Sequence, residues 1–325
     1  MEKRLHKPAA GTIRVGISGW TYVPWRGTFY PKNLPQKNEL AYASAMLPSI
    51  EINGTFYALQ RPKSYAAWHA QTPDDFVFSV KANRFITHIR RLRQVETPIA
   101  NFLLSGLLRL NEKLGPILWQ FPPNLKFDSE LFETFLAQLP HSTRDSLKLR
   151  KRCDARMKGR TWAEIDRDRP MRHAVEIRHV SFATEKFIRL LRKHRVALVT
   201  ADTAGKWPML HDVTADFVYV RLHGAEELYA SGYTEPALEE WAAKIRAWSR
   251  SSGVPNAHRI GPAAPKRDKR DVFVYFDNDV KVRAPFDAGR LAVKLGLRDR
   301  PLEEAGPAET NEVRRPQWPG GRRVK

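Results

Sequence analysis

Cysteine is almost absent from the sequence, since Cys153 is the only one among 325 residues and no internal disulfide bond can form. Its basic neighbours Lys151, Arg152 and Arg156 favour a thiolate, but a lone cysteine without a paired base does not predict a catalytic nucleophile. Chains without disulfides are typical of reducing compartments. We therefore expect a cytoplasmic protein.

Long apolar runs are missing as well. The longest, at residues 117–121 and 196–201, fall far short of the roughly 20 residues that a membrane helix needs. The charged N-terminus leads directly into a β-like segment, without an apolar stretch of signal-peptide length. We expect neither a membrane partner nor secretion.

Three sequence motifs of well-known chemistries are also absent: the phosphate-binding GxxxxGK[ST] loop, GxGxxG after a strand, and the GxSxG nucleophile elbow. Nucleotide-driven and serine-hydrolase reactions are therefore disfavoured. The sequence identifies no cofactor and no oligomeric state.

Acidic residues are scarce relative to basic ones: the chain has 35 Asp and Glu and 55 Lys and Arg, which gives a net charge of +20. A charge of this size attracts polyanions whatever the fold. The basic residues concentrate at 144–172, at 266–270 and in both tails. Contact with nucleic acid is one interpretation, and solubility or a general arginine bias is the other.

Short runs rich in Val, Ile and Phe alternate with helical patterns, as in proteins built from β/α units. Eight runs lie near residues 13–18, 49–53, 76–81, 117–121, 174–178, 196–201, 217–222 and 272–276. Eight units predict an α/β fold of a single domain, a TIM-type (β/α)8 parallel barrel.

The clearest helix follows the seventh run, where Thr234 can cap the helix, Pro236 fits its first turn, and Leu238, Trp241 and Trp248 share one apolar stripe. Other helices are expected at residues 38–47, 63–71, 99–113, 129–139, 184–194 and 286–295.

The barrel should occupy residues 12–297, after a basic N-terminal tail at 1–11. Two basic insertions, near 144–172 and 253–270, interrupt the pattern and should be surface loops. Residues 298–325 have few periodic apolar residues, which predicts a disordered basic tail.

Polar residues occupy alternate positions at the ends of the predicted strands, where a barrel strand is expected to be apolar. They should meet at the C-terminal mouth of the barrel, where barrel enzymes hold their sites. We expect them to be Glu51, Asn53, Lys81, Gln120, Glu176, Arg178, Asp202, Arg221, His223 and, after the last strand, Asp277 or Asn278, of which Asn278 is the candidate for substrate binding.

Buried charges are costly unless they are paired, so this ring has two interpretations. It can be a salt-bridge network that only closes the barrel. Alternatively it is a substrate site, in which Glu51 or Glu176 acts as general acid or base, Lys81 and Arg178 bind an anionic group, and His223 shuttles a proton. In that site the catalytic candidates are Glu51, Glu176, His223 and Lys81.

Aromatic residues after the first, second and seventh strands would supply a stacking wall for a sugar or base. Trp20 and Tyr57 are the substrate-binding candidates among them. A metal site using Glu176 and His179 is disfavoured, because the nearby Lys and Arg charges would repel a cation, and no metal ligand is predicted.

Seven motifs in order, GISGWTYVPWRGTFYP, IEINGTFY, TPDDFVFSVKANRFITH, LGPILWQFPP, HAVEIRHVSF, YVRLHG and YFDND, are similar to those of the domain-of-unknown-function 72 (YecE-like) family. The resemblance extends from about Val15 to Leu297. It implies a TIM-type barrel and implies no reaction.

The leading hypothesis is an enzyme that uses general acid/base chemistry on a polar or anionic, sugar-like or nucleotide-like substrate at the barrel mouth. The alternative is a nucleic-acid-binding, nuclease-like barrel with a basic and aromatic mouth. A scaffold whose polar ring only stabilises the barrel is the third interpretation.

Overall fold

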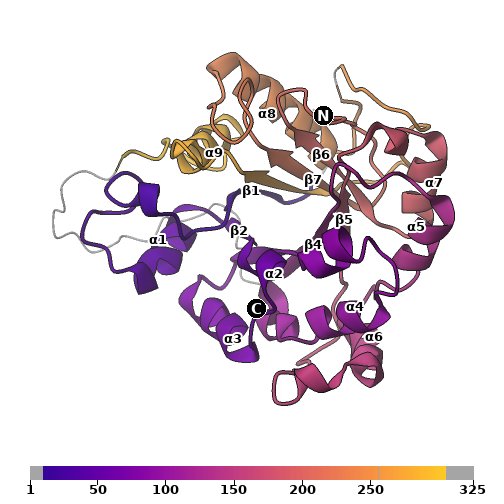
Figure 1. The fold of residues 1–325 in the computed structure, drawn as a ribbon. Coiled ribbons are helices and arrows are strands. Elements are labelled where there is room, and N and C mark those ends of the chain that lie inside the picture. The colour runs from indigo at the N-terminus through magenta and orange to yellow at the C-terminus, as the bar shows by residue number, and fades with distance from the viewer. Residues whose placement is uncertain (1–9, 255, 305–325) are drawn as a thin grey trace, which may run out of the picture.

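The computed structural model describes residues 10–254 and 256–304 and contains a closed barrel of parallel strands, as the sequence predicts. Each strand pairs with the next one along the chain, and the last pairs with the first (Figure 1). The strands are β1 (Ile13–Ser18), β2 (Ser49–Ile52), β3 (Val77–Lys81), β4 (Leu114–Gln120), β5 (His173–Glu176), β6 (Ala197–Asp202), β7 (Phe217–Leu222) and β8 (Asp271–Phe276).

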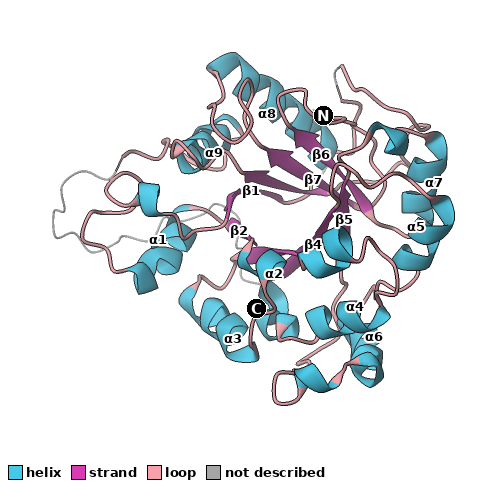
Figure 2. Cartoon of the chain, in the orientation of Figure 1, coloured by secondary structure: helices cyan, strands magenta, loops and turns pink. Residues whose placement is uncertain are grey.

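Helices surround this ring on the outside (Figure 2). They are α1 (Glu39–Met46), α2 (Gly54–Tyr57), α3 (Pro62–Gln71), α4 (Glu96–Leu103), α5 (Ser129–Leu136), α6 (Thr143–Leu147), α7 (Glu185–Lys193), α8 (Glu235–Ser249) and α9 (Arg283–Lys294). In α8, the Thr234 side chain accepts a hydrogen bond from the backbone N–H of Ala237, and Leu238, Trp241 and Trp248 are buried. The prediction for this helix is confirmed.

Successive side chains of each strand point alternately into two hydrophobic cores. The residues that point outward pack under the helices, and those that point inward fill the barrel. The inner core contains Val77, Leu118, Ala174, Ala197, Val199, Ala201, Ala215, Phe217, Tyr219, Phe273 and Tyr275. Because this apolar packing fills the barrel interior, the polar inward residues further along the same strands lie towards the C-terminal mouth.

One predicted helix is wrong, because residues 99–113 do not form a continuous helix. Helix α4 ends at Leu103, and a 3-10 segment begins at Leu107. Gly106 separates them with φ +127°, and a Cβ atom there would lie 2.6 Å from the Cα atom of Pro62. Only glycine fits both this backbone conformation and the close approach of α3.

The insertion at 144–172 is also more ordered than a loop. It includes most of α6 and further 3-10 turns, and the Thr143 hydroxyl and the Arg144 backbone N–H both donate hydrogen bonds to Asp168. Within it, burial and the neighbouring Asp154 raise the pKa of Cys153. The expectation that basic neighbours favour its thiolate was wrong, because burial dominates.

The connection from β6 to β7, residues 203–216, contains no helix. The second insertion covers this part of the barrel: the backbone N–H groups of Ile260 and Gly261 donate hydrogen bonds to the Asp212 carboxylate at 2.9 and 2.8 Å. His258 and His211 are also joined by backbone hydrogen bonding. In Figure 1 the insertion runs in orange between α8 and α7.

Most of both predicted tails lies outside the described residues, which do not include 1–9 and 305–325. Of the rest of the C-terminal segment, Arg298 donates a hydrogen bond to the carbonyl oxygen of Met46 at 2.7 Å, and Leu302 packs against the hydrophobic core. In residues 10–254 and 256–304, none of the helices combines the length and hydrophobicity of a bilayer span.

Candidate active site at the barrel mouth

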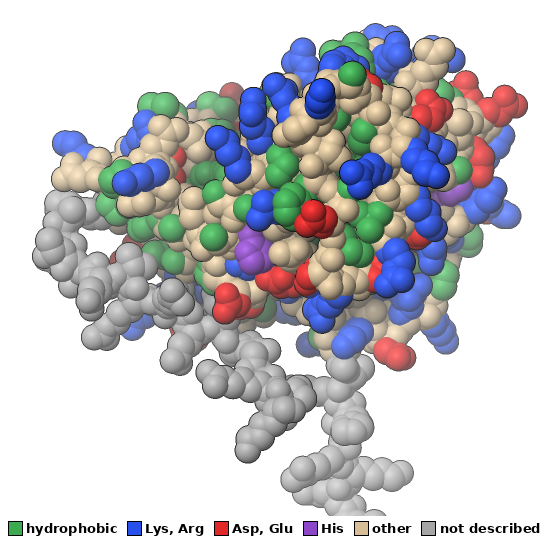
Figure 3. Space-filling view, turned by 90° about the horizontal axis from the view of Figure 1, so that it is seen from below, with side chains coloured by type: hydrophobic (Ala, Val, Ile, Leu, Met, Phe, Trp, Pro, Cys, Tyr) green, Lys and Arg blue, Asp and Glu red, His purple; other side chains and the backbone are tan. Residues whose placement is uncertain are grey.

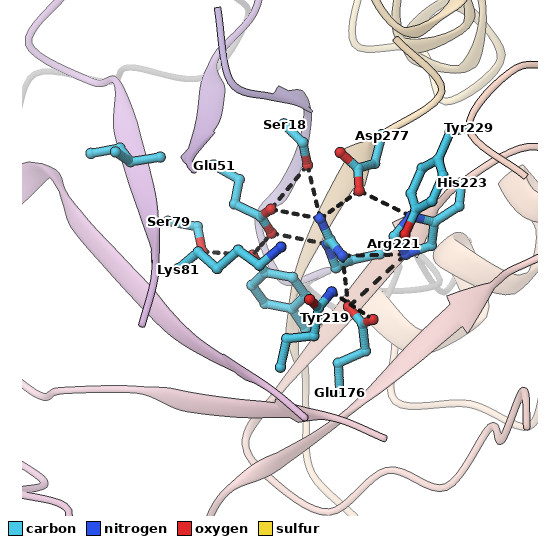
Figure 4. A network of polar contacts seen from close by, with 12 residues as sticks. Ser18, Glu51, Ser79, Lys81, Glu176, Tyr219, Arg221, His223, Tyr229 and Asp277 are labelled. Carbon is cyan, nitrogen blue, oxygen red and sulfur yellow. Dashed lines mark hydrogen bonds and ion pairs between the residues drawn. The ribbon is translucent and has the colours of Figure 1, made fainter. Parts of the chain in front are cut away.

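Arg221, at the end of β7, is the centre of the polar network and is fully buried. Its guanidinium lies between carboxylates on β2, on β5 and directly after β8 (Figure 4). Nη2 is 2.9 Å from Glu51 Oε1 and 2.8 Å from Asp277 Oδ2, and Nη1 is 2.7 Å from Glu176 Oε2. The surrounding carboxylates keep Arg221 charged, with its pKa well above the usual value although burial opposes this. The guanidinium thus occupies the point where the carboxylates meet.

Glu51, on β2, accepts hydrogen bonds at both oxygens in addition to those from Arg221. The Ser18 hydroxyl donates to Oε1 at 3.0 Å, and the Tyr219 hydroxyl donates to Oε2 at 2.6 Å. Tyr219 was not predicted, yet it shares the inner face of β7 with Arg221 and His223. The same alternation that identified those two residues would have found it.

Glu176, on β5, is equally surrounded. The Gln120 amide donates to its Oε1 at 2.9 Å, and Arg178 Nε donates to the same oxygen at 2.8 Å. Burial alone would raise the pKa of Glu176, but Arg221 and Arg178 overcome it and hold that pKa well below its usual value. Glu176 is therefore a permanent anion at neutral pH, which does not suit a general acid.

Arg178 is held on three sides. Besides Glu176, its Nη2 donates to the Tyr229 hydroxyl at 3.2 Å, and its guanidinium lies 3.9 Å from the ring centroid of Trp207. This aromatic contact was not predicted, because Trp207 belongs to the connection after β6 and follows no strand directly.

His223 and Asp277 form a close pair, with 3.0 Å between His223 Nδ1 and Asp277 Oδ2. His223 is fully buried, and burial together with Arg221 lowers its pKa, although Asp277 opposes this. Burial would raise the pKa of Asp277, but Arg221 and His223 hold it below its usual value. Asp277, and not Asn278, is thus the residue after β8 that joins the network.

Lys81, on β3, differs from the other charged residues of the mouth. It is 9% exposed, and its Nζ forms no ion pair with any described residue. The ammonium lies 4.6 Å from the ring centroid of Phe56. Burial, and then the charge of Arg221, lower the pKa of Lys81 to about 8, although nearby carboxylates partly oppose them. Its amine can therefore change protonation near neutral pH.

Asp279 is the second group that titrates near neutrality, and it was missing from the predicted site. Burial and the charge of Asp277 raise its pKa to about 6. Its neighbour Tyr22 donates a hydrogen bond to the Ser18 carbonyl oxygen at 2.6 Å. Asn53 lies beside the same tyrosine, and among the described residues the buried Asn53 Oδ1 has no hydrogen-bond partner.

Two predicted residues face away from the mouth. In β6 the inward side chains are Ala197, Val199 and Ala201, so Asp202 points outward and accepts a hydrogen bond from the Tyr233 hydroxyl at 3.1 Å. Asn278 is likewise one residue out of phase with Asp277. Its amide donates a hydrogen bond to Asp287 at 2.9 Å.

The two predicted stacking residues have different surroundings. Trp20 packs edge-on against Trp68, with ring centroids 5.5 Å apart, and is half-buried. Tyr57 is 69% exposed and lines a neighbouring cleft of about 410 Å³. Phe85, Arg61 and Arg160 line the same cleft, whereas Lys81 and Arg221 do not.

Among the described residues, no group of three or more His, Cys, Asp or Glu side chains is arranged to hold a metal ion. Glu176 and His179, considered together in the sequence, diverge: His179 Nδ1 lies 2.9 Å from the Ser181 hydroxyl.

A parallel eight-stranded barrel with a charged network at its C-terminal mouth defines the class of this molecule as a TIM-type barrel protein. The model of the family "Protein of unknown function DUF72" matches residues 14–311. The chain therefore belongs to this family, in agreement with the resemblance of its motifs.

Relatives support this assignment. The UPF0759 protein YunF of Bacillus subtilis (strain 168) is 33% identical over 116 residues, which are 34% of this chain and 40% of YunF. A DUF72 family protein (TM1631) from Thermotoga maritima has a similar structure, with a TM-score of 0.65 at 25% identity, covering 88% of this chain and 99% of that one. The structure of a DUF72 family protein (EF0366) from Enterococcus faecalis has the same fold, with a TM-score of 0.64 at 18% identity, covering 92% of this chain and 100% of that one.

Proposed function

We propose that this protein is an enzyme that performs general acid/base chemistry on a polar substrate at the barrel mouth. The observation that carries the proposal is Lys81: a buried amine without an ion pair among the described residues, with its pKa lowered to about 8. In a network that only stabilises the fold, an unpaired buried cation is not expected, because burying a charge without a partner costs free energy. Groups that titrate near the working pH transfer protons most effectively.

The roles differ from those expected from the sequence. Lys81 and Asp279 are the proton-transfer groups, since their pKa values of about 8 and about 6 lie on either side of neutrality. Glu51 and Glu176 hold Arg221 in place by hydrogen bonds and charge. Asp277 acts on both proton-transfer groups, raising the pKa of each.

The substrate should present both a hydrogen-bond donor and an acceptor. Asn53 Oδ1 is a buried acceptor without a partner among the described residues, and Lys81 Nζ is a donor without an ion pair. The mouth contains charges of both signs beside the aromatic rings of Trp207 and Tyr229. A sugar-like or nucleotide-like molecule combines hydroxyl groups with an apolar face and fits this surface.

The test is a thermal-shift screen of the full chain with monosaccharides, sugar acids, sugar phosphates and nucleoside monophosphates, followed by turnover assays on any compound that stabilises it. We expect at least one compound to raise the melting temperature of wild type but not of Asn53→Ala, and its turnover to be lost in Lys81→Met. Arg189→Gln, an exposed change on α7, is the control. If no compound binds, or if binding is unchanged in Asn53→Ala, the proposal is wrong.

The second candidate function, binding of a nucleic-acid strand, is favoured by the cleft beside the mouth. Tyr57 and Phe85 offer partly exposed rings there, and Arg61 and Arg160 form no ion pair with any described residue. Rings interleaved with arginine suit stacked bases and phosphates. By contrast, basic side chains on the face shown in Figure 3 are spread among acidic and apolar ones and form no single stripe.

A further inference from the structure

Lys81 has the surroundings of a nucleophile as well as those of a proton-transfer group. It is the last residue of β3, and in Figure 4 its side chain extends into the mouth towards Arg221. Its Nζ forms neither an ion pair nor a hydrogen bond with the residues that the structure describes. Nζ is nevertheless not one of the fully enclosed side-chain atoms that lack a partner, so it stays in contact with solvent. The amine is therefore both unoccupied by protein groups and accessible.

The groups around Lys81 favour the uncharged form of its amine. The ring of Phe56 lies on one side, with 4.6 Å between Nζ and the ring centroid. Burial, and then the charge of Arg221, lower the pKa of Lys81 to about 8, while nearby carboxylates oppose them, namely those of Asp277, Glu51 and Glu176. At pH 7 about one amine in ten is then uncharged, which is roughly 300 times the fraction for an ordinary lysine. Only the uncharged amine attacks carbon, and desolvation and a neighbouring cation are two means of activating it.

An uncharged histidine lies against the same aromatic ring. His88, in the helical turn after β3, contacts Phe56 edge-on, with ring centroids 5.0 Å apart. Burial, and then the charge of Lys81, lower the pKa of His88 to about 4, so its imidazole is neutral at pH 7. A neutral imidazole accepts a proton at one nitrogen and donates one from the other. Lys81 thus has a group beside it that can move the protons of a reacting amine.

We propose that Lys81 forms an imine with the carbonyl carbon of an uncharged, sugar-like aldehyde or ketone in its open-chain form. This inference rests on the proposed function and names its substrate class. The free amine attacks the carbonyl carbon, and one N–H proton moves to the oxygen, which gives a carbinolamine. The hydroxyl group then leaves as water with the second N–H proton, and a C=N bond remains. The step needs neither an oxidant nor a reductant.

The charges of the mouth favour a carbonyl compound without a charge of its own. The charged groups described there are four carboxylates and three cations, namely Glu51, Glu176, Asp277, Asp279, Lys81, Arg178 and Arg221. Both arginines are bound to carboxylates, and the reaction uses the amine of Lys81. A carboxylate or phosphate group on the substrate would therefore add to an excess of negative charge. Aldoses and ketoses suit the mouth better than sugar acids or sugar phosphates.

The experiment is reductive trapping of the full chain at pH 7 with sodium cyanoborohydride, which converts an imine into a stable secondary amine that peptide mass mapping locates. The uncharged probes are glycolaldehyde, glyceraldehyde and dihydroxyacetone, and pyruvate is the charged one. We expect at least one uncharged probe to label Lys81 ten or more times faster than Lys206, an exposed lysine after β6, because far more of the Lys81 amine is free at this pH. Lys81→Met should lose this adduct, and Lys206→Met should retain it.

Labelling of Lys81 no faster than that of Lys206, with every uncharged probe, overturns the inference. Labelling by pyruvate as fast as by glyceraldehyde overturns the assignment to uncharged compounds. The proposed function fails or stands separately. A compound that stabilises wild type and is turned over only with Lys81 present, yet leaves no adduct, refutes the imine and supports proton transfer. An adduct on Lys81 without turnover of any compound supports the imine and refutes the proposed function.

Discussion

Replacing Lys81 by methionine should make the protein more stable at pH 7. In the folded state the pKa of Lys81 is about 8 instead of 10.5. Below pH 8 this amine is charged in both states, so its burial opposes folding by about 3 kcal/mol, taking about 1.4 kcal/mol for each pKa unit. Methionine keeps a long apolar side chain against Phe56 and removes the charge. We expect a gain of about 1 to 3 kcal/mol in the free energy of unfolding.

The pH dependence gives a second check on the same variant. As pH rises from 8 towards 10.5, the folded state of wild type loses the Lys81 proton while the unfolded state retains it, so wild type gains stability relative to the variant. The advantage of Lys81→Met should therefore shrink between pH 7 and 9.5. Urea denaturation followed by tryptophan fluorescence at both pH values measures it.

Lys113→Met is the matched control, because Lys113 is also buried but has partners. Its Nζ donates to the carbonyl oxygens of His69 and Thr72 at 2.7 and 2.8 Å. Losing them leaves buried acceptors unsatisfied, so this variant should lose about 1 to 3 kcal/mol. A Lys81→Met protein that is less stable than wild type at pH 7, or whose advantage does not change with pH, would refute the reasoning.

Three further predictions concern the mouth and its surroundings. Glu176→Gln should lower the free energy of unfolding by about 3 to 5 kcal/mol in urea denaturation, because it leaves Arg221 and Arg178 short of a buried counter-charge, and a loss below about 1 kcal/mol would contradict a buried network. Because the pKa of Asp279 is raised to about 6, its ionisation should lower the stability of wild type as pH rises from about 4 through 6. The melting temperature of Asp279→Asn should therefore exceed that of wild type at pH 7 but not at pH 3.5. An equal difference at both pH values would contradict the assignment. Wild type should be retained on a single-stranded DNA column at low salt and released steeply as salt rises. Retention should be weaker for Tyr57→Ala, which loses a ring that can stack on bases, than for the similarly exposed control Val180→Ala; equal retention of both would place binding outside the cleft.

The alternation of side chains along each strand predicts most residues of the polar network at the barrel mouth. Glu51, Lys81, Glu176 and Arg221 all occupy inward positions, because side chains alternate strictly along a strand. Asp202 and Asn278 fail for the same reason, since an error of one residue in phase turns a side chain to the other face. In β6 the small inward residues Ala197 and Ala201 are the better guide, because polar Thr200 and Asp202 are satisfied outside the barrel.

The properties that distinguish Lys81 and Asp279 could not be predicted from the sequence. Lys81 and Arg178 look alike as cations at strand ends, yet only Arg178 reaches a carboxylate. That difference depends on distances of a few ångströms between strands, which periodicity does not give. Asp279 lies beyond β8, where alternation no longer applies, and its raised pKa depends on Asp277 and on burial together.

The helix missing between β6 and β7 also affects the order in which the barrel can be completed during synthesis. The outer side of this connection is covered by residues that come much later, and His211 and His258 are 47 positions apart. A ribosome adds about 5 to 20 residues each second, so several seconds pass between the synthesis of β6 and β7 and that of the second basic insertion, which covers them. During that interval the apolar side of the growing sheet is exposed to other nascent chains. Chaperones that hold such surfaces should therefore act on this protein late, after β7 has emerged.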